Sequence, residues 1–223
     1  MPRQARIGLP NHVYHVTNRG NNRDRVFLDE EDFRKYLEIL ARYKSKEGFR
    51  LYHWVLMNNH VHLLLAIPEG GSLAKAMHGI NLSYTSWFNR KYNRVGHLWQ
   101  GRFKSLPVEN DKYLLACGRY IERNPLRVGL VESLGGYFWS SFLAHAEGRQ
   151  DGITDRHGIF AGQFGTGTPE SYRDFVCENC EREEQELRER MSRGVLGSLS
   201  FRETIRQAAV SARRPQRGRP RKK

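Results

Sequence analysis

Apolar and aromatic residues in the first part of the chain form short runs that predict strands. Residues 12–19 alternate weakly and are rich in β-forming residues, and residues 49–57 form a second such run. A third run, residues 60–67, follows after only Asn58 and Asn59. Because asparagine tolerates the positive φ that a two-residue turn needs, the second and third runs are predicted to form a β-hairpin.

Apolar residues at helical spacing predict three helices. Asp29, Ser72 and Asn110 precede the helical patterns, and each is a residue type that caps a helix N-terminus. Pro125 is expected to stop the third helix at Asn124, because proline lacks the N–H that a helix interior requires.

The order of these elements predicts an α+β fold. Residues 97–109 are expected to form a fourth strand, interrupted by Gly101 and Pro107. The order βαββαβα is typical of the ferredoxin-like (RRM-like) fold, in which helices cross one face of a four-stranded antiparallel sheet. We predict one domain over residues 1–150 and a C-terminal extension over residues 151–223. A charged helix near residues 171–191 and a basic tail are expected in that extension.

The net charge predicts a polyanionic partner. The chain has 37 Lys and Arg against 24 Asp and Glu, a net charge of +13, and nucleic acid is the commonest partner of such a basic protein. Residues 190–223 contain eleven Lys and Arg and one acid, Glu203, so this tail carries +10 and the rest of the chain +3. The tail is predicted to have little that can pack. Its final stretch, RRPQRGRPRKK, is expected to be disordered by itself.

Cysteine usage and hydropathy indicate a reducing compartment and no membrane segment. The three cysteines, Cys117, Cys177 and Cys180, are too few and odd in number for a disulfide framework. Cys177 and Cys180 could form half of a zinc site, but no second cysteine pair follows and no histidine stands at a standard spacing. No apolar stretch of 18 residues occurs. We therefore predict a cytoplasmic protein that does not associate with a membrane.

His60-Val61-His62 lies on the predicted third strand. Side chains two residues apart in a strand point to the same face, so both imidazoles project together while Val61 points to the other side. Two neutral imidazoles in this arrangement form half of a divalent-metal site, although two polar residues on a solvated face are the alternative. His12 or His15 could approach this pair if the first strand lies beside the third, but neither is predicted as a ligand.

Tyr120 and Asn124 lie four residues apart on the predicted third helix. This spacing places both side chains on one face, about one turn apart. The tyrosine offers a phenol, and the asparagine offers a carbonyl oxygen that can bind a hard cation. A core tyrosine and a polar helix end before Pro125 would give the same spacing.

Two longer motifs connect these residues to a known family. The motif NNHVHLLL and, some 60 residues later, RYIERNPLRVGLV stand in the order and at the spacing of the REP-associated tyrosine transposases. The stretches WVLMNNHVHLL, GHLWQGRFKS and WSSF also match. The chain resembles this family over roughly residues 5–145. The family belongs to the single-tyrosine branch of the His-hydrophobic-His (HUH) endonucleases.

The resemblance implies a DNA endonuclease and strand transferase that acts in DNA transposition and recombination. His60, His62 and Asn124 would bind Mg²⁺ or Mn²⁺, and Tyr120 would be the nucleophile. The family forms a covalent 5′-phosphotyrosine and a free 3′-hydroxyl, which keeps the bond energy for rejoining. The implied substrate is single-stranded or hairpin DNA from a palindromic repeat. The protein would act as a monomer or a homodimer.

Two groups of residues are candidates for DNA contact. The first is a basic cluster in the NRGNNRDR loop, a region that lies near the DNA in this family; a solvated loop is the alternative. The second lies on the predicted fourth strand, although its tryptophan also suits a core position. The candidates are Arg19, Arg23 and Arg25 in the first group and Trp99, Arg102 and Lys104 in the second.

Three other functions remain as alternatives. The chain could bind hairpin DNA without cutting it, but the complete set of His60, His62, Tyr120 and Asn124 argues for activity. An RNA-binding ferredoxin-like protein would not need this set of residues. A rolling-circle replication initiator shares the chemistry, but the flanking motifs resemble transposases. The sequence does not indicate the target DNA or whether this copy is mobile.

Overall fold

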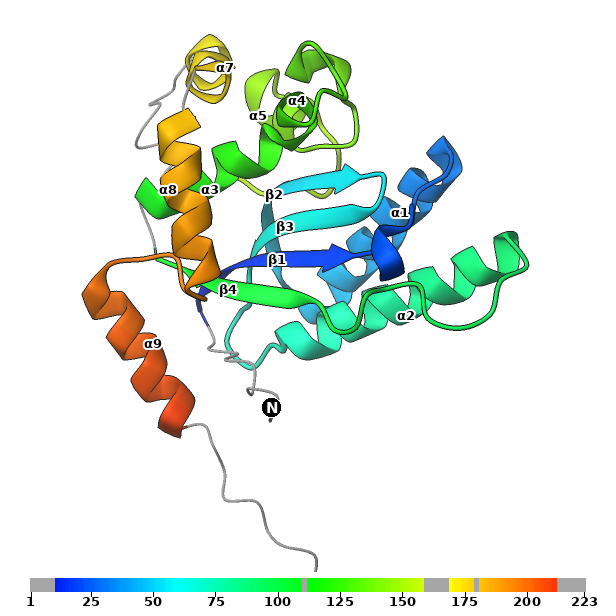
Figure 1. The fold of residues 1–223 in the computed structure, drawn as a ribbon, viewed down its shortest axis with the longest axis horizontal. Coiled ribbons are helices and arrows are strands. Elements are labelled where there is room, and N and C mark those ends of the chain that lie inside the picture. The colour runs from blue at the N-terminus through cyan, green and yellow to red at the C-terminus, as the bar shows by residue number, and fades with distance from the viewer. Residues whose placement is uncertain (1–10, 110–111, 159–168, 179–180, 212–223) are drawn as a thin grey trace, which may run out of the picture.

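Four antiparallel strands form one sheet in the order β2-β3-β1-β4 (Figure 1). The structure is a computed structural model that describes residues 11–109, 112–158, 169–178 and 181–211. The strand order and the intervening helices confirm the predicted ferredoxin-like α+β fold. The strands are β1 (Val13–Arg19), β2 (Arg50–Met57), β3 (His60–Ala66) and β4 (Lys104–Val108).

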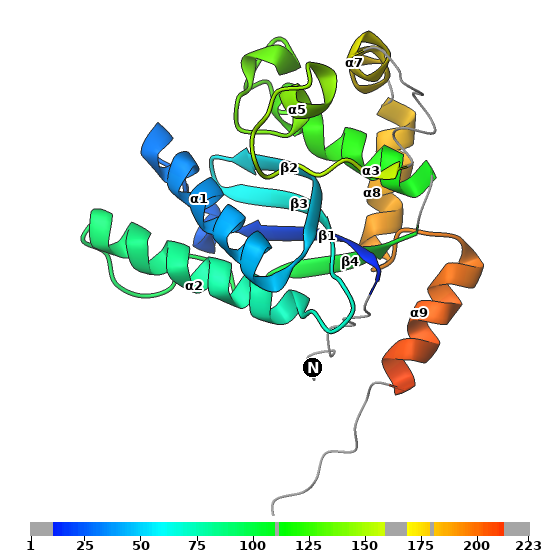
Figure 2. The same ribbon diagram turned by 180° about the vertical axis from the view of Figure 1, so that it is seen from behind.

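Helices α1 (Glu30–Glu47) and α2 (Leu73–Lys91) cover one face of the sheet (Figure 2). Their predicted N-caps are confirmed, because the side chains of Asp29 and Ser72 accept hydrogen bonds from backbone N–H groups of the first turns. Gly48 ends α1 with a φ of 67°, a conformation that favours glycine. Val16, Leu63 and the helical side chains form the larger buried core on this face.

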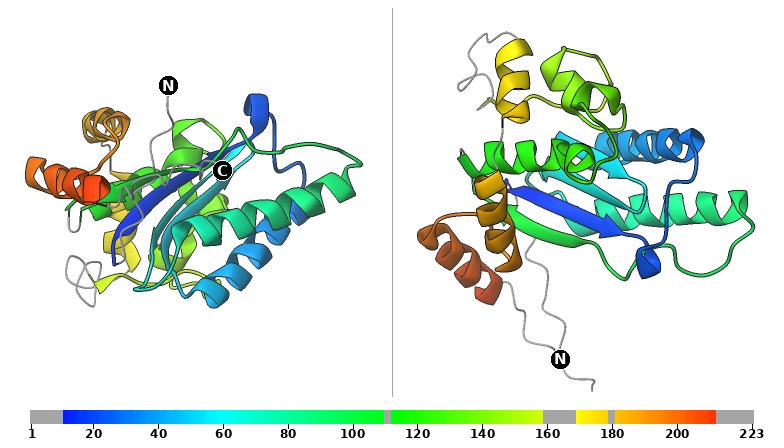
Figure 3. Two further views of the ribbon diagram at one scale, coloured as in Figure 1. Left: turned by 90° about the horizontal axis from the view of Figure 1, so that it is seen from below. Right: turned by 45° about the horizontal axis from the view of Figure 1, so that its top comes forward.

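The opposite face of the sheet is covered by later parts of the chain. Helix α3 (Lys112–Glu122) packs on β2 and β3. Helices α5 (Phe142–Ala146), α7 (Pro169–Cys177) and α8 (Glu181–Ser192) belong to the same layer (Figure 3). A second buried core lies here and includes Val55, Leu64, Tyr120 and Phe142. Helices therefore cover both faces of the sheet, and the predicted nucleophile, Tyr120, belongs to the second layer. The remaining helices of the described residues are α4 (Asn124–Arg127) and α9 (Leu199–Ser211), with 3₁₀ turns η1 (Asn21–Arg23) and η2 (Leu134–Gly136).

The fourth strand is shorter than predicted. Residues 97–103 lie outside it, and only an isolated bridge joins Trp99 to Gly20. Gly101 has a φ of 70°, which turns the chain before β4 begins. Pro107 stands inside β4, where its carbonyl accepts a hydrogen bond from the N–H of Leu196 at 2.9 Å. A proline fits this position because β4 is an edge strand of the sheet.

The C-terminal extension packs on the domain more closely than the sequence indicated. Ile153 belongs to the core on the α1/α2 face, and Leu187 and Leu196 belong to the core on the other face. Ile205 of α9 is also buried. The prediction that the basic tail has little to pack is therefore wrong for residues 195–211, while RRPQRGRPRKK lies outside the described residues. The proposed boundary at residue 150 stays a prediction.

Within the described residues, no helix is both long enough and apolar enough to cross a membrane. The cytoplasmic location stays a prediction. Of the Cys177 and Cys180 pair, Cys177 is exposed and unbridged at the end of α7, and Cys180 lies outside the described residues.

Candidate active site

Strand β3 presents His60 and His62 on the face of the sheet that α3 covers. Val61 between them is fully buried in the core of the α1/α2 face, as the alternation predicts. The two imidazole rings lie 5.0 Å apart, centroid to centroid, at 74° to one another. In the strand register, His62 stands opposite Thr17 on β1, and His60 stands opposite Arg19.

Each of the two imidazoles is held through its Nδ1 atom. Nδ1 of His62 lies 2.8 Å from Nε2 of His15, and Nδ1 of His60 lies 2.5 Å from Oδ1 of Asn59. This leaves the Nε2 atoms of both His60 and His62 for a ligand, the arrangement found when histidines bind metals. His15 thus orients His62, a role that the sequence did not assign. The sequence contained the information for this role. Strands β1 and β3 are neighbours in this fold, and His15 points to the same face of the sheet as Thr17 and Arg19, which pair with His62 and His60.

The environment favours neutral imidazoles. Burial lowers the pKa of His15 to about 4. Burial also lowers the pKa of His60 to about 4, with smaller contributions from the charges of Arg19 and Arg127. Burial also lowers the pKa of His62 well below its usual value. The nearby His15, His60, Arg127 and Arg19 lower it further. Neutral imidazole is the form that binds a metal ion, so these groups are prepared for that role near neutral pH.

Tyr120 on α3 lies over the histidines. Its ring centroid is 6.1 Å from that of His62 and 6.3 Å from that of His15, with the rings edge to face in both cases. The side chain is mostly buried, so the protein around it restricts its position. The structure therefore brings the predicted nucleophile and the predicted histidine pair together.

Pro125 does not end the helical path, contrary to the prediction. Helix α3 stops at Glu122, and after Arg123 the chain continues as α4 with Pro125 in its first turn, where proline is tolerated. The missing N–H of Pro125 leaves the carbonyl of Ile121 without its helical donor. The side-chain amide nitrogen of Asn124, Nδ2, takes the place of this donor. It donates hydrogen bonds to the carbonyl of Ile121 at 3.1 Å and to the carbonyl of Tyr120 at 2.9 Å.

The continuation into α4 brings Arg127 to the face that carries Tyr120 and Asn124. The guanidinium carbon of Arg127 lies 4.4 Å from the centre of the Tyr120 ring. Its Nη2 donates a hydrogen bond to Oδ1 of Asn124. From the sequence alone Arg127 receives no role, because the helix is expected to end before Pro125. Tyr120, Asn124 and Arg127 have the spacing i, i+4, i+7, which places residues of a continuous helix on one face.

The donors on this face suit a hard divalent cation. His60 and His62 supply two neutral imidazole nitrogens. The amide of Asn124 is fixed by its hydrogen bonds to α3, and its carbonyl oxygen keeps a second lone pair beyond the bond from Arg127. Among the described residues, the side chain of Asn124 is hydrogen-bonded to Tyr120, Ile121 and Arg127, and no hydrogen bond joins it to either histidine. Its role as a ligand therefore remains a proposal.

The other predicted DNA-contact residues divide into exposed and buried ones. Arg19 is exposed at the end of β1, beside His60, and Lys104 is exposed opposite Thr17 on the same face as His62. Trp99 packs instead against aromatic rings of the α1/α2 core, as the core alternative expected, and exposes little surface for stacking. The remaining candidates, Arg23, Arg25 and Arg102, are also exposed.

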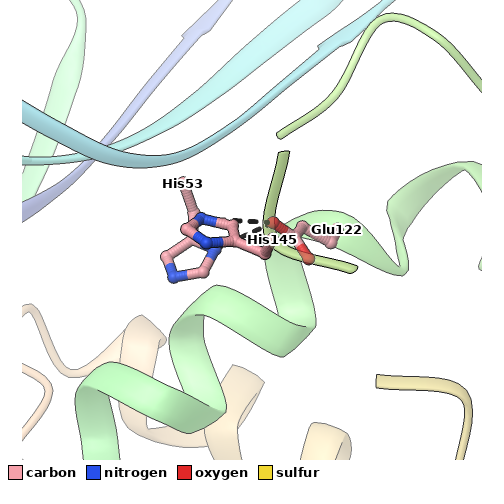
Figure 4. A group of neighbouring side chains, drawn as sticks. All are labelled: His53, Glu122 and His145. Atoms are coloured by element: carbon pink, nitrogen blue, oxygen red, sulfur yellow. Dashed lines mark hydrogen bonds and ion pairs between the residues drawn. The ribbon is translucent and has the colours of Figure 1, made fainter. Parts of the chain in front are cut away.

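A second group of histidines and a carboxylate is buried beside the candidate site (Figure 4). His53 of β2, Glu122 of α3 and His145 of α5 offer ligand atoms within 4.8 Å of one another, so the group could hold a divalent metal. However, Oε1 of Glu122 already accepts hydrogen bonds from His53 at 2.9 Å and Ser141 at 2.6 Å, and Oε2 accepts one from Tyr172 at 2.7 Å. These bonds join β2, α5 and α7 to the end of the helix that carries Tyr120.

The charges within this group are balanced by its hydrogen bonds. Burial alone would raise the pKa of Glu122, but His53 and the hydrogen bond from Ser141 outweigh burial and lower it. Nε2 of His145 bonds to the carbonyl of Tyr52 at 2.8 Å, and burial lowers the pKa of His145 to about 4. These buried hydrogen bonds rigidify the elements that they join, and here they fix α3 over the sheet.

Comparisons with known proteins agree with this geometry. The family described as "Transposase IS200 like" matches residues 9–124, which is more than half of the 223-residue chain. The REP-associated tyrosine transposase of Escherichia coli is 22% identical over 130 residues, which are 58% of this chain and 74% of that protein. A solved structure of a REP-associated tyrosine transposase bound to a REP hairpin aligns with a TM-score of 0.57. That alignment has 20% identity and covers 70% of this chain and 89% of that one, which shows a shared fold. The chain belongs to the IS200-like transposase family and is a DNA-processing protein of the transposase class.

Proposed function

We propose that this protein is a metal-dependent single-tyrosine transposase that nicks and rejoins single-stranded or hairpin DNA. One observation carries the proposal: Tyr120 lies over His62, while the Nε2 atoms of His60 and His62 are left for a ligand. The hairpin in the solved relative supports the same class of substrate, a palindromic repeat. Arg19 and Lys104 extend the site along the sheet as phosphate contacts.

The chemistry begins with attack of the Tyr120 oxygen on the phosphorus of one linkage. The bond from phosphorus to the 3′ oxygen breaks, which leaves a 5′-phosphotyrosine and a free 3′-hydroxyl. The phenol loses a proton and the departing 3′ oxygen gains one, so protons balance. A 3′-hydroxyl can then attack the phosphotyrosine and rejoin the strand without ATP, because the covalent bond to Tyr120 stores the bond energy.

The metal site would be formed by His60, His62 and Asn124, with Mg²⁺ or Mn²⁺ as the ion. A divalent cation there would stabilise the charge that develops on the non-bridging phosphate oxygens. The side chains themselves act by position: His15 and Asn59 aim the two imidazoles, and helix carbonyls hold the amide of Asn124.

The test is a search for the covalent protein–DNA adduct. Labelled hairpin DNA with a single-stranded extension is incubated with the protein and Mn²⁺, and denaturing gels separate free from linked DNA. Tyr120→Phe should bind the DNA but form no adduct, because only the hydroxyl is removed. Tyr113→Phe is the matched control on the same helix, where the Tyr113 hydroxyl faces Arg190 instead. EDTA and His62→Ala should each abolish the adduct.

Two results would contradict the proposal. An adduct that persists in Tyr120→Phe would move the nucleophile to another tyrosine. Hairpin binding by the unsubstituted protein without any adduct, with either Mg²⁺ or Mn²⁺, would favour a DNA-binding protein that does not cut.

A further inference from the structure

Arg127 lies beside the predicted nucleophile, Tyr120, and beside Asn124, one of the predicted metal ligands. Its guanidinium lies 4.4 Å from the centre of the Tyr120 ring and donates to Oδ1 of Asn124. One cationic side chain therefore contacts both the predicted nucleophile and one predicted metal ligand.

The guanidinium retains donors that no described residue satisfies. Nη1 of Arg127 is buried and makes no hydrogen bond to the described part of the chain. The carboxylate of Glu184 on α8 forms an ion pair with Nη1 at 3.6 Å, a distance longer than a hydrogen bond. Glu184 is bound more closely by Arg123 at 2.8 Å and by Arg188 at 3.3 Å.

Arg127 is more exposed than the neighbouring Arg123: 23% of its side chain is exposed, against 12% for Arg123. Arg123 on the neighbouring turn shows the contrast. Its guanidinium donates to the carbonyls of Val176 and Glu178 as well as to Glu184, which ties α8 and the end of α7 to α4.

We propose that Arg127 is a catalytic residue that binds the phosphate group attacked by Tyr120. The inference rests on the proposed single-tyrosine chemistry. A guanidinium offers parallel N–H donors that match the oxygens of a phosphate, which an ammonium group does not. Placed beside the phenol, it stabilises charge on the phosphate during the attack. The same side chain orients Asn124, so phosphate and metal ligand are positioned together.

The first test measures binding without chemistry. In a Tyr120→Phe background, the protein is titrated with hairpin DNA in which one linkage at a time is a neutral methylphosphonate, with Mn²⁺ present. A methylphosphonate at the linkage that Arg127 binds should weaken binding of the hairpin DNA about 10- to 100-fold, the usual range for a hydrogen bond between charged groups. Adding Arg127→Met should remove most of that penalty at the same linkage and at no other. Arg123→Gln is the matched control and should leave the penalty in place.

The second test measures the reaction. With Tyr120 intact and DNA saturating, Arg127→Met should slow single-turnover adduct formation about 100- to 1,000-fold, as for loss of one donor to a developing oxyanion. Arg127→Lys should recover only part of that rate, because the planar fork is lost. Circular dichroism establishes that the variants are folded.

The outcomes separate this inference from the proposed function. Equal methylphosphonate penalties with and without Arg127 at every linkage would overturn the role of Arg127, whether or not the unsubstituted protein forms the adduct. A penalty that depends on Arg127, in a protein that forms no adduct, would overturn its catalytic role and the covalent chemistry together. It would leave Arg127 as a DNA contact.

Discussion

At the scale of single residues, the candidate site depends on which atom of each side chain is already engaged. Nδ1 of His62 and Nδ1 of His60 are hydrogen-bonded within the protein, to His15 and Asn59. The side-chain amide nitrogen of Asn124 donates to a backbone carbonyl of α3. Each of these side chains is therefore held with little rotational freedom. Because these groups are already ordered in the folded protein, DNA binding loses less conformational entropy at the site.

His15 provides the residue-scale prediction. His15→Asn removes the partner of the His62 ring and should weaken Mn²⁺ binding about 10- to 100-fold, the usual effect of losing the group that orients a metal ligand. Isothermal titration of the DNA-free protein with Mn²⁺ measures this directly. His78→Gln, an exposed substitution on α2, should leave the affinity unchanged. Equal Mn²⁺ affinity in His15→Asn and the unsubstituted protein would show that His15 does not orient a ligand.

At the scale of secondary-structure elements, the position of α3 over the sheet decides where Tyr120 lies. Gly118 allows this approach, because a Cβ there would stand 2.7 Å from Nε2 of His53. The hydrogen bonds of Glu122 to His53, Ser141 and Tyr172 hold the same end of the helix. The close packing and the buried network act together, since both join α3 to β2.

Gly118→Ala should therefore destabilise the protein although alanine favours helices. Overpacking costs about 1–3 kcal/mol and helix propensity returns about 1 kcal/mol, so a net loss of about 1–2 kcal/mol is expected in urea unfolding. Adduct formation should slow as well, because α3 must move away from the sheet. Gly135→Ala is the control, since a Cβ there meets nothing within 4 Å. An unchanged unfolding free energy in Gly118→Ala would contradict the close approach.

The same network predicts loss of stability in acid. The pKa of His145 is about 4 in the folded protein, whereas an unfolded histidine titrates near ~6.5. The unfolded chain thus binds a proton that the folded one does not, so stability is present above about pH 6.5 and is lost as pH falls toward 4. The lowered pKa of Glu122 acts in the same direction below the usual carboxyl range.

Urea unfolding between pH 7 and pH 4 measures this linkage. His145→Gln should reduce the number of protons taken up on unfolding by about one, because it removes one such group. The glutamine amide can still donate to the carbonyl of Tyr52, which limits the structural cost. An identical pH slope in His145→Gln would place the acid sensitivity elsewhere.

At the scale of the whole molecule, the C-terminal extension packs on the layer that carries the candidate site, and its last residues are strongly basic. Leu196 joins β4 through backbone hydrogen bonds with Pro107 and Glu109, and Glu184 reaches the arginines beside the active site. Residues 212–223 add seven further Lys and Arg and no acid. Packing and charge are thus divided between successive parts of the extension.

Two truncations separate these contributions. Ending the chain at Ser211 should weaken DNA binding and flatten its salt dependence, by about 0.7 in the logarithmic slope for each phosphate no longer neutralised. Adduct formation at saturating DNA should persist. Ending it at Met191 removes Leu196 and Ile205 in addition, so the free energy of unfolding should fall as well. Equal stability of the two truncated chains would show that α9 and Leu196 contribute little to the fold.

The sequence by itself determined the first three strands, the two caps and the shared face of His60 and His62, because these depend on local conformational preference and on the period of a strand. The spacing of Tyr120 and Asn124 likewise follows from helical geometry. The tertiary structure decided what lies across the sheet. It placed His15 beside His62 through strand pairing, buried Trp99, and placed Leu196 on the edge strand.

Arg127 shows the physical reason for this division. Proline marks a break in a regular helix, and that local preference is correct for α3, which ends at Glu122. Whether the chain then turns away or continues depends on whether the freed carbonyl of Ile121 finds another donor. Here the Asn124 side chain supplies it, and the helical path carries Arg127 onto the ring of Tyr120. Local patterns set each element, whereas contacts between distant residues complete the site, because their free energies depend on partners that no short stretch of sequence contains.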